Sequence, residues 1–88
     1  MKSVTRHELA SKIEAYLQHK ITMKELVHWA EQSQIEGSYE EGWFDQINEV
    51  LTRLGVADVQ NFELAWEDYE RFLHLLGYSV RLNITPAA

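Results

Sequence analysis

The sequence predicts an all-α fold: a four-helix bundle of short antiparallel helices followed by a short extended C-terminal segment. Three observations predict it: apolar residues recur at helical spacing, capping patterns precede these stretches, and glycines follow them. The chain has 88 residues, the length of one domain, and 45% apolar with 25% charged residues is typical of a globular protein. We therefore expect a single helical domain over residues 1–88.

The clearest helix is predicted over residues 39–54. Ser38 is followed three residues later by Glu41, the spacing of a capping box, and Gly55 provides an end. One apolar stripe is expected to face the core: Trp43, Ile47, Val50, Leu51 and Leu54. The opposite face carries Glu41, Asp45 and Glu49, spaced four residues apart. Like charges at this spacing weaken a helix by a few tenths of a kcal/mol per pair. The acidic residues on this face therefore do not stabilise the helix, and we expect them to have another role.

Two earlier helices are predicted over residues 6–18 and 23–36. Thr5 with Glu8 and Thr22 with Glu25 both have capping-box spacing. Their core-facing residues are predicted to be Leu9, Ile13, Tyr16 and Leu17 in the first helix, and Met23, Leu26, Val27, Ala30 and Ser33 in the second. Because the connection between them is short, we expect an antiparallel helical hairpin.

A fourth helix is predicted over residues 59–76, with Asp58 as its candidate cap and Gly77 at its end. Its apolar positions are Val59, Phe62, Ala65, Trp66, Tyr69, Phe72, Leu73 and Leu76. A break near residues 61–64 is the alternative, because Leu64 has the spacing to contact Tyr69 across a later helix start.

The C-terminal residues 78–85 change to a strand-like period of two. Apolar Tyr78, Val80, Leu82 and Ile84 alternate with polar residues. A single strand needs a partner for its backbone groups. Three arrangements remain open: pairing with residues 60–64, a homodimer through Tyr78–Ile84, or an extended tail laid over the bundle.

Charge is distributed unevenly along the chain. The net charge is −6, and residues 25–70 contain twelve acidic residues against one basic residue, Arg53. This block disfavours nucleic acid as a partner, because phosphates repel it, and favours a basic protein partner. The alternative is a solvated surface that keeps the protein soluble.

Sequence patterns for catalysis or metal binding are sparse. The chain has no cysteine, which excludes disulfides and thiol chemistry. Glu25 and His28 form one Glu-x-x-His unit, but a di-iron bundle needs two such units and further carboxylates. Glu70 and His74 are predicted to be a surface pair one helical turn apart. No serine has a nucleophile context and the glycines do not form a phosphate loop. We therefore predict no enzyme activity, no metal and no cofactor.

No apolar stretch approaches the length of a membrane span, and the N-terminal residues lack the pattern of a signal peptide. We therefore predict no membrane interaction and a cytoplasmic location.

The passage Ala10–Leu26, with Lys20-Ile21-Thr22 and Glu25-Leu26, resembles the opening helical hairpin of colicin D-type immunity proteins. The resemblance implies a small acidic helical bundle that blocks a toxin nuclease. Such an inhibitor presents carboxylates where the RNA substrate of the nuclease would bind.

The charge pattern predicts a protein-binding or inhibitory surface centred on the third helix. In this hypothesis Glu41, Asp45 and Glu49 attract a basic protein partner, and Tyr39 is an aromatic anchor. The predicted partner-binding residues are Glu36, Tyr39, Glu40, Glu41, Asp45 and Glu49. The alternative function is a self-associating structural or regulatory helical domain without catalytic activity.

Overall fold

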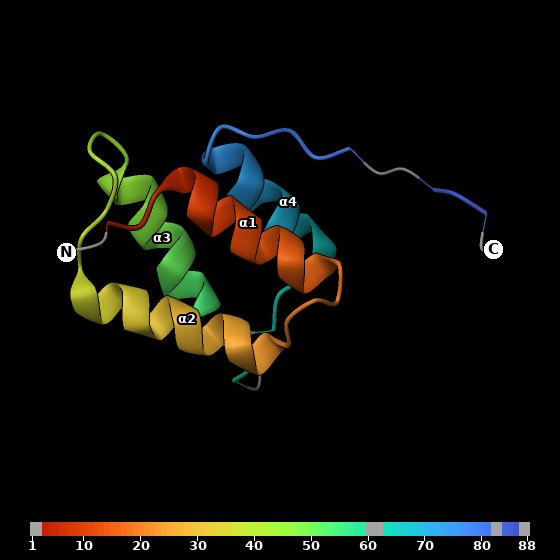
Figure 1. Cartoon of the computed structure of the whole chain (residues 1–88), viewed down its shortest axis with the longest axis horizontal. Coiled ribbons are helices and arrows are strands. Elements are labelled where there is room, and N and C mark those ends of the chain that lie inside the picture. Colours follow the sequence, from red (N-terminus) through yellow and green to blue (C-terminus); the bar gives the residue numbers. More distant parts are fainter. Residues whose placement is uncertain (1–2, 60–62, 82–83, 87–88) are drawn as a thin grey trace.

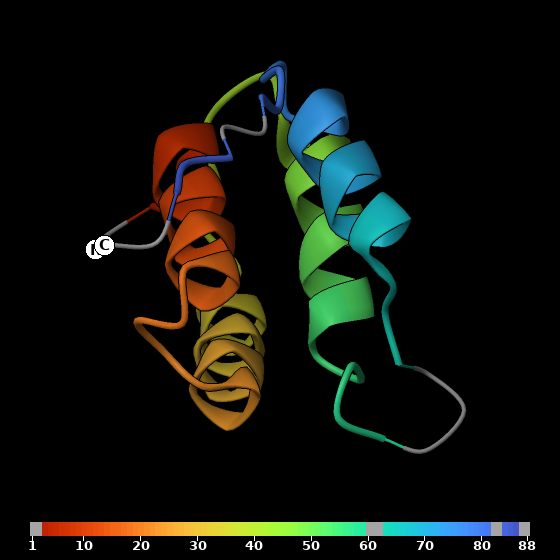
Figure 2. The same ribbon diagram turned by 90° about the vertical axis from the view of Figure 1, so that its right-hand side faces the viewer.

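The computed structural model describes residues 3–59, 63–81 and 84–86, and these residues form four helices and no strand. The helices are α1 (Arg6–Leu17), α2 (Met23–Glu36), α3 (Phe44–Leu54) and α4 (Trp66–Leu75). Their order along the chain is shown in Figure 1, where α2 returns beneath α1 after a short turn. Turned by 90°, the molecule shows α1 and α2 on one side and α3 and α4 on the other (Figure 2). The fold is therefore compact and all-helical.

The core lies where the apolar stripes of the four helices meet. Its fully buried side chains come from α1, α2 and α3, and from the residue that follows α4: Leu9, Ile13, Leu26, Ala30, Ile47, Val50, Leu51, Leu54 and Leu76. Tyr69 of α4 adds an aromatic contact to Tyr16 of α1, with 5.5 Å between ring centroids. Periodic burial confirms most of the predicted core-facing residues of the first three helices, whereas four of them are only partly buried at the edge of the core: Tyr16, Leu17, Met23 and Trp43.

The starts of α1 and α2 follow from local sequence. The Thr5 hydroxyl accepts a hydrogen bond from the Glu8 amide at 3.0 Å. At α2 both halves of the capping box form: Thr22 Oγ1 accepts from the Glu25 amide, and the Glu25 carboxylate accepts from the Thr22 amide. Gly37, with a φ of 67°, ends α2 in the left-handed region. The predicted bounds 23–36 are confirmed, and α1 ends one residue before the predicted 18.

The end of α1 places a histidine in a conformation that favours glycine. His19 has a φ of 62°, and its amide donates to the Tyr16 carbonyl while the Lys20 amide donates to the Ala15 carbonyl. These two bonds satisfy carbonyls in the last turn, as in a Schellman motif. Because a Cβ atom is crowded in this region, His19 carries local strain.

We expect His19→Gly to raise the free energy of unfolding by about 0.5–1 kcal/mol, because glycine relieves the strain but costs some entropy in the unfolded chain. Urea unfolding of both proteins under the same conditions measures this difference in the free energy of unfolding. Gln18→Gly is the matched control: Gln18 has a φ of −90°, so glycine relieves no strain there. Equal stabilisation by both variants would contradict the strain at His19.

The predicted start of the third helix is wrong. Residue 38 does not cap a helix at 39, because its backbone carbonyl accepts a hydrogen bond from the Val4 amide at 2.8 Å. The Glu40 amide donates to the Val4 carbonyl, so Val4 and Tyr39 form a parallel bridge. The Ser38 hydroxyl pairs with that of Ser3, and Gly42 turns the chain with a φ of 85°. Helix α3 therefore starts at Phe44, five residues later than predicted.

The predicted start of the fourth helix is also wrong. Residues 55–58 form turns, residues 63–65 are not helical, and α4 begins at Trp66. The Asp68 carboxylate accepts from the Ala65 amide at 2.8 Å and so satisfies a free amide at this start. Val59, Ala65 and Trp66 are consequently exposed instead of buried. Residues 60–62, including Phe62, lie outside the described residues.

The C-terminal segment follows α4 without regular secondary structure in its described residues. The Tyr78 amide donates to the Leu73 carbonyl, and Val80 packs against the core. The segment then leaves the helices beyond the end of α1 (Figure 1), and Ile84 is 87% exposed. The predicted pairing partner, residues 60–64, lies partly outside the described residues. Leu82 also lies outside them.

Candidate protein-interaction surface

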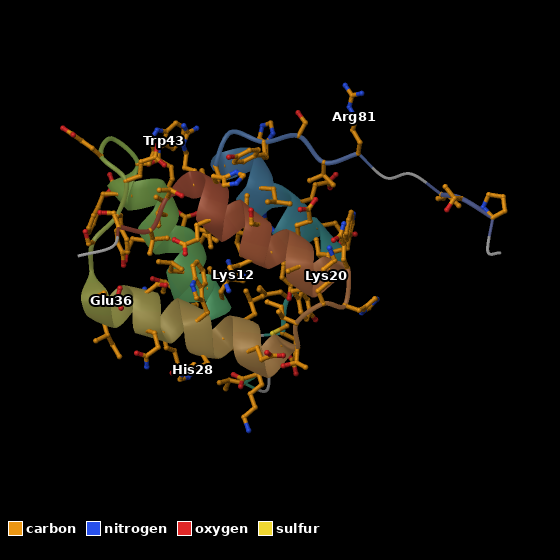
Figure 3. All side chains as sticks on the ribbon, in the orientation of Figure 1. Lys12, Lys20, His28, Glu36, Trp43 and Arg81 are labelled. Atoms are coloured by element: carbon orange, nitrogen blue, oxygen red, sulfur yellow. The ribbon has the colours of Figure 1, made fainter. Side chains whose placement is uncertain are left out.

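The six predicted binding residues lie at the end of α2, in the loop 37–43 and on α3. This loop runs along one end of the molecule, on the side where Figure 3 labels Glu36 and Trp43. The six do not share one role, because two of them are engaged with the rest of the fold. We call Glu36, Glu41, Asp45 and Glu49, whose side chains are all exposed, the acidic edge.

Glu40 connects the loop to the start of α1. One carboxylate oxygen accepts from the Arg6 amide at 2.9 Å, and the other lies 3.4 Å from Arg6 Nε. The carboxylate therefore satisfies a free amide at the positive end of the α1 dipole. The Arg6 guanidinium also lies 4.0 Å from the ring centroid of Trp43 and donates to the Leu76 carbonyl at 3.4 Å. Glu40 thus holds the loop in place.

Tyr39 is the second of the six predicted residues that contacts the rest of the fold. Its hydroxyl donates to Asn48 Oδ1 at 3.3 Å, and its ring lies 5.0 Å from the ring of Phe44. Partial burial raises the pKa of the Tyr39 hydroxyl above its ordinary value. Tyr39 therefore stays neutral at physiological pH and fixes the position of Phe44.

Phe44 is the residue that the sequence analysis missed. Its side chain is 55% exposed although it is a large aromatic residue at the first position of α3. Helical spacing gives no signal for this exposure, because Phe44 stands three residues before Ile47 and seven before Leu51, in phase with the stripe that faces the core. An exposed aromatic ring held by a second ring is typical of the anchors in protein interfaces.

The four carboxylates of the acidic edge form no ion pair with any residue that the structure describes. Arg53 is the only basic residue between positions 25 and 70, and its guanidinium lies 5.8 Å from the Phe72 ring centroid, towards α4. Within the described residues, the four carboxylates of the acidic edge are therefore not neutralised by an ion pair, in contrast to Glu40.

Two of these charges, those of Glu36 and Glu49, lie at electrostatically unfavourable positions of their helices. Glu36 is the last residue of α2, at the negative end of the helix dipole. Asp45 and Glu49 repel each other one turn apart on α3, although Asp45 interacts favourably with the positive end of that helix. Solubility alone does not require acids at unfavourable positions. This placement favours a role for the edge in binding.

The other candidate sites have simpler roles. The Glu25 carboxylate completes the α2 capping box, and the hydrogen bonds from Thr22 lower the pKa of this exposed group. Glu70 and His74 are exposed on α4. Within residues 3–59, 63–81 and 84–86, no three His, Asp or Glu side chains are grouped so that they could hold a metal ion. The described chain therefore brings no ligand set together around Glu25 and His28.

Comparison of the chain with protein-family models, with curated proteins and with solved structures finds no match. Among the described residues, no helix has the length and apolar composition that crossing a membrane requires. Function is therefore inferred from the surface chemistry of this chain.

Proposed function

We propose that this protein is a small binding module, of the inhibitory or immunity type, whose acidic edge occupies a basic surface of a protein partner. One observation carries the proposal: four exposed carboxylates form no ion pair with a described residue, and α3, which carries two of them, also carries the exposed ring of Phe44. The proposal contains no catalytic step, no cofactor and no nucleic acid. It assigns the protein to the cytoplasm.

Charge and the aromatic ring have different tasks in this function. The acidic edge attracts a basic partner over a distance of about 8 Å at physiological ionic strength and so raises the association rate. Phe44 then enters an apolar pocket of the partner and slows dissociation. Arg6 and Glu40 keep the loop in its bound shape, which lowers the entropic cost of binding.

The acidic edge is tested with proteins captured from a lysate of the source cell at low and moderate salt. We expect the triple variant Glu41→Gln, Asp45→Asn, Glu49→Gln to bind a captured partner about tenfold more weakly at low salt, with a smaller salt dependence. We expect Phe44→Ala to weaken binding with an unchanged salt dependence, because it removes no charge.

The control for net charge is the triple variant Glu31→Gln, Glu67→Gln, Glu70→Gln. These three carboxylates are exposed elsewhere on the surface, so this variant has the same net charge as the first triple variant. Equal weakening by both triple variants, or binding that is insensitive to salt, would sink the proposed role of the acidic edge.

A second candidate function is self-association through Tyr78–Ile84. It is favoured by Ile84, which is the most exposed of the large apolar side chains in the described chain. Such a homodimer would make the chain a structural or regulatory module. Sedimentation velocity over a wide concentration range tests it, because a monomer at every concentration is incompatible with this function.

A further inference from the structure

Three segments that are far apart in the sequence meet around the side chain of Arg6, the first residue of α1. The Arg6 guanidinium lies 4.0 Å from the ring centroid of Trp43 (Figure 3), at the end of the loop 37–43. Its Nη1 donates to the Leu76 carbonyl at 3.4 Å, directly after α4. Its Nε lies 3.4 Å from the Glu40 carboxylate. One guanidinium therefore connects the end of α4 with the loop.

Gly77 lies against this guanidinium. A Cβ atom placed on Gly77 would stand 3.2 Å from Arg6 Nη1 and 3.9 Å from Cη2 of the Trp43 ring. The first distance is shorter than the optimal contact of about 3.5–4.0 Å, so a side chain at residue 77 requires the guanidinium to move. The bond to the Leu76 carbonyl is already long, since hydrogen bonds of this kind usually measure about 2.7–3.2 Å. Displacement of the guanidinium therefore weakens it further.

The conformation of Gly77 explains only part of this arrangement. With a φ of 91°, Gly77 ends α4 in a Schellman motif, in which the amides of residues 77 and 78 donate to carbonyls in the last turn of the helix. Such a turn favours glycine. His19, however, has a φ of 62° in a similar turn after α1, so this protein accommodates a side chain there. The contact with Arg6 is thus a second requirement at residue 77, which the turn does not impose.

We propose that Gly77 is a positioning residue for the loop 37–43 and that it acts through Arg6. Because Gly77 has no side chain, it leaves the space that the guanidinium occupies between the end of α4 and the loop. The end of α4 thereby stabilises a loop that carries Glu41 and leads into Phe44. The assignment of this loop to binding rests on the proposed function. Within that function, the chain at residue 77 regulates the part of the acidic edge that the loop carries.

Coupling of this kind acts in both directions. A rotation of the chain at Gly77 moves the Leu76 carbonyl and so removes one of the contacts that hold the Arg6 guanidinium in place. Conversely, a partner that fixes the loop also stabilises the end of α4 through the same guanidinium. The residues that follow α4 are therefore linked energetically to the binding surface, although they are not part of it.

Hydrogen exchange in a double-mutant cycle tests the coupling. The reporters are the amides of Val4 and Glu40, which form the hydrogen bonds between the N-terminal segment and the loop. We expect Gly77→Ala to speed their exchange about threefold more in the otherwise wild-type chain than in an Arg6→Ala background. The backbone strain of alanine at residue 77 is present in both backgrounds, so it cancels in the comparison.

Arg71→Ala is the matched control background, because Arg71 is an exposed arginine whose ion pair with Asp68 lies within α4. We expect the full effect of Gly77→Ala to remain there. Gly77→Asn replaces Gly77→Ala if the alanine variant does not fold, since asparagine tolerates a left-handed turn and also has a Cβ atom. Circular dichroism shows whether each variant is folded.

Equal acceleration of the two reporter amides in the wild-type and Arg6→Ala backgrounds would overturn the proposal, because Gly77 would then serve only the turn at the end of α4. The cycle uses the protein alone and needs no partner. Its failure is therefore distinguishable from failure of the proposed function, which is decided by the binding measurements on the acidic edge.

Discussion

Replacing Leu51 by alanine is expected to lower the free energy of unfolding by about 3 kcal/mol. Leu51 is completely buried on α3. Alanine removes its packing contacts and leaves a cavity that the surrounding helices fill only partly. For an 88-residue chain whose total stability is expected to be roughly 4–13 kcal/mol, such a loss is a large share of the whole. Thermal unfolding should therefore show a fall in Tm of about 15 °C.

Phe44→Ala is the matched control on the same helix. Because Phe44 is more than half exposed, we expect this change to cost less than about 1 kcal/mol. Urea titration of both variants gives the two values under the same conditions. Similar losses for the two variants would show that the buried face of α3 is assigned incorrectly.

Replacing Arg6 by alanine is expected to lower the free energy of unfolding by about 1–2 kcal/mol. The change removes the side-chain contact with Glu40, the stacking on Trp43 and the hydrogen bond to the Leu76 carbonyl. The pair is partly exposed, which keeps the cost below that of a buried ion pair. Amide hydrogen exchange should also become faster in residues 38–43, because Arg6 holds this loop against the start of α1.

Arg71→Ala provides the comparison for a surface ion pair. Arg71 pairs with Asp68 one turn away on α4, and its side chain is 64% exposed. We expect its removal to cost less than about 0.5 kcal/mol and to leave exchange in residues 38–43 unchanged. Arg6→Lys tests the planar group, since lysine keeps the charge but cannot form the same stacked contact. Full retention of stability in Arg6→Lys would show that charge alone accounts for the effect of Arg6.

The stability of this loop also bears on the proposed function. Residues 38–43 carry Glu41 and lead into Phe44 and Asp45, so the bond between Arg6 and Glu40 positions part of the acidic edge. Glu40 was predicted to bind a partner, whereas its carboxylate is engaged with Arg6. In the proposed module it acts on binding through the loop that it holds.

The sequence by itself determined the elements whose signals are local. Thr22 and Glu25 satisfy each other's backbone amides within four residues, and Gly37 ends the same helix, so both ends of α2 were predictable. The core stripe of α3 was equally predictable, because helical periodicity places Ile47, Val50 and Leu51 on one face whatever the exact helix start.

Only the tertiary structure decided where α3 begins and which side chains are free to bind. Ser38 and Glu41 match a capping box in sequence. In the structure, however, the backbone groups of this segment form hydrogen bonds with Val4, more than 30 residues away. The same contact region joins Glu40 to Arg6 and leaves Phe44 exposed. A single sequence carries no local signal for such distant partners, since two backbone segments pair according to how the helices between them pack. The acidic composition was evident from the sequence. Only the fold shows that Glu40 is bonded to Arg6, whereas the four carboxylates of the acidic edge are exposed.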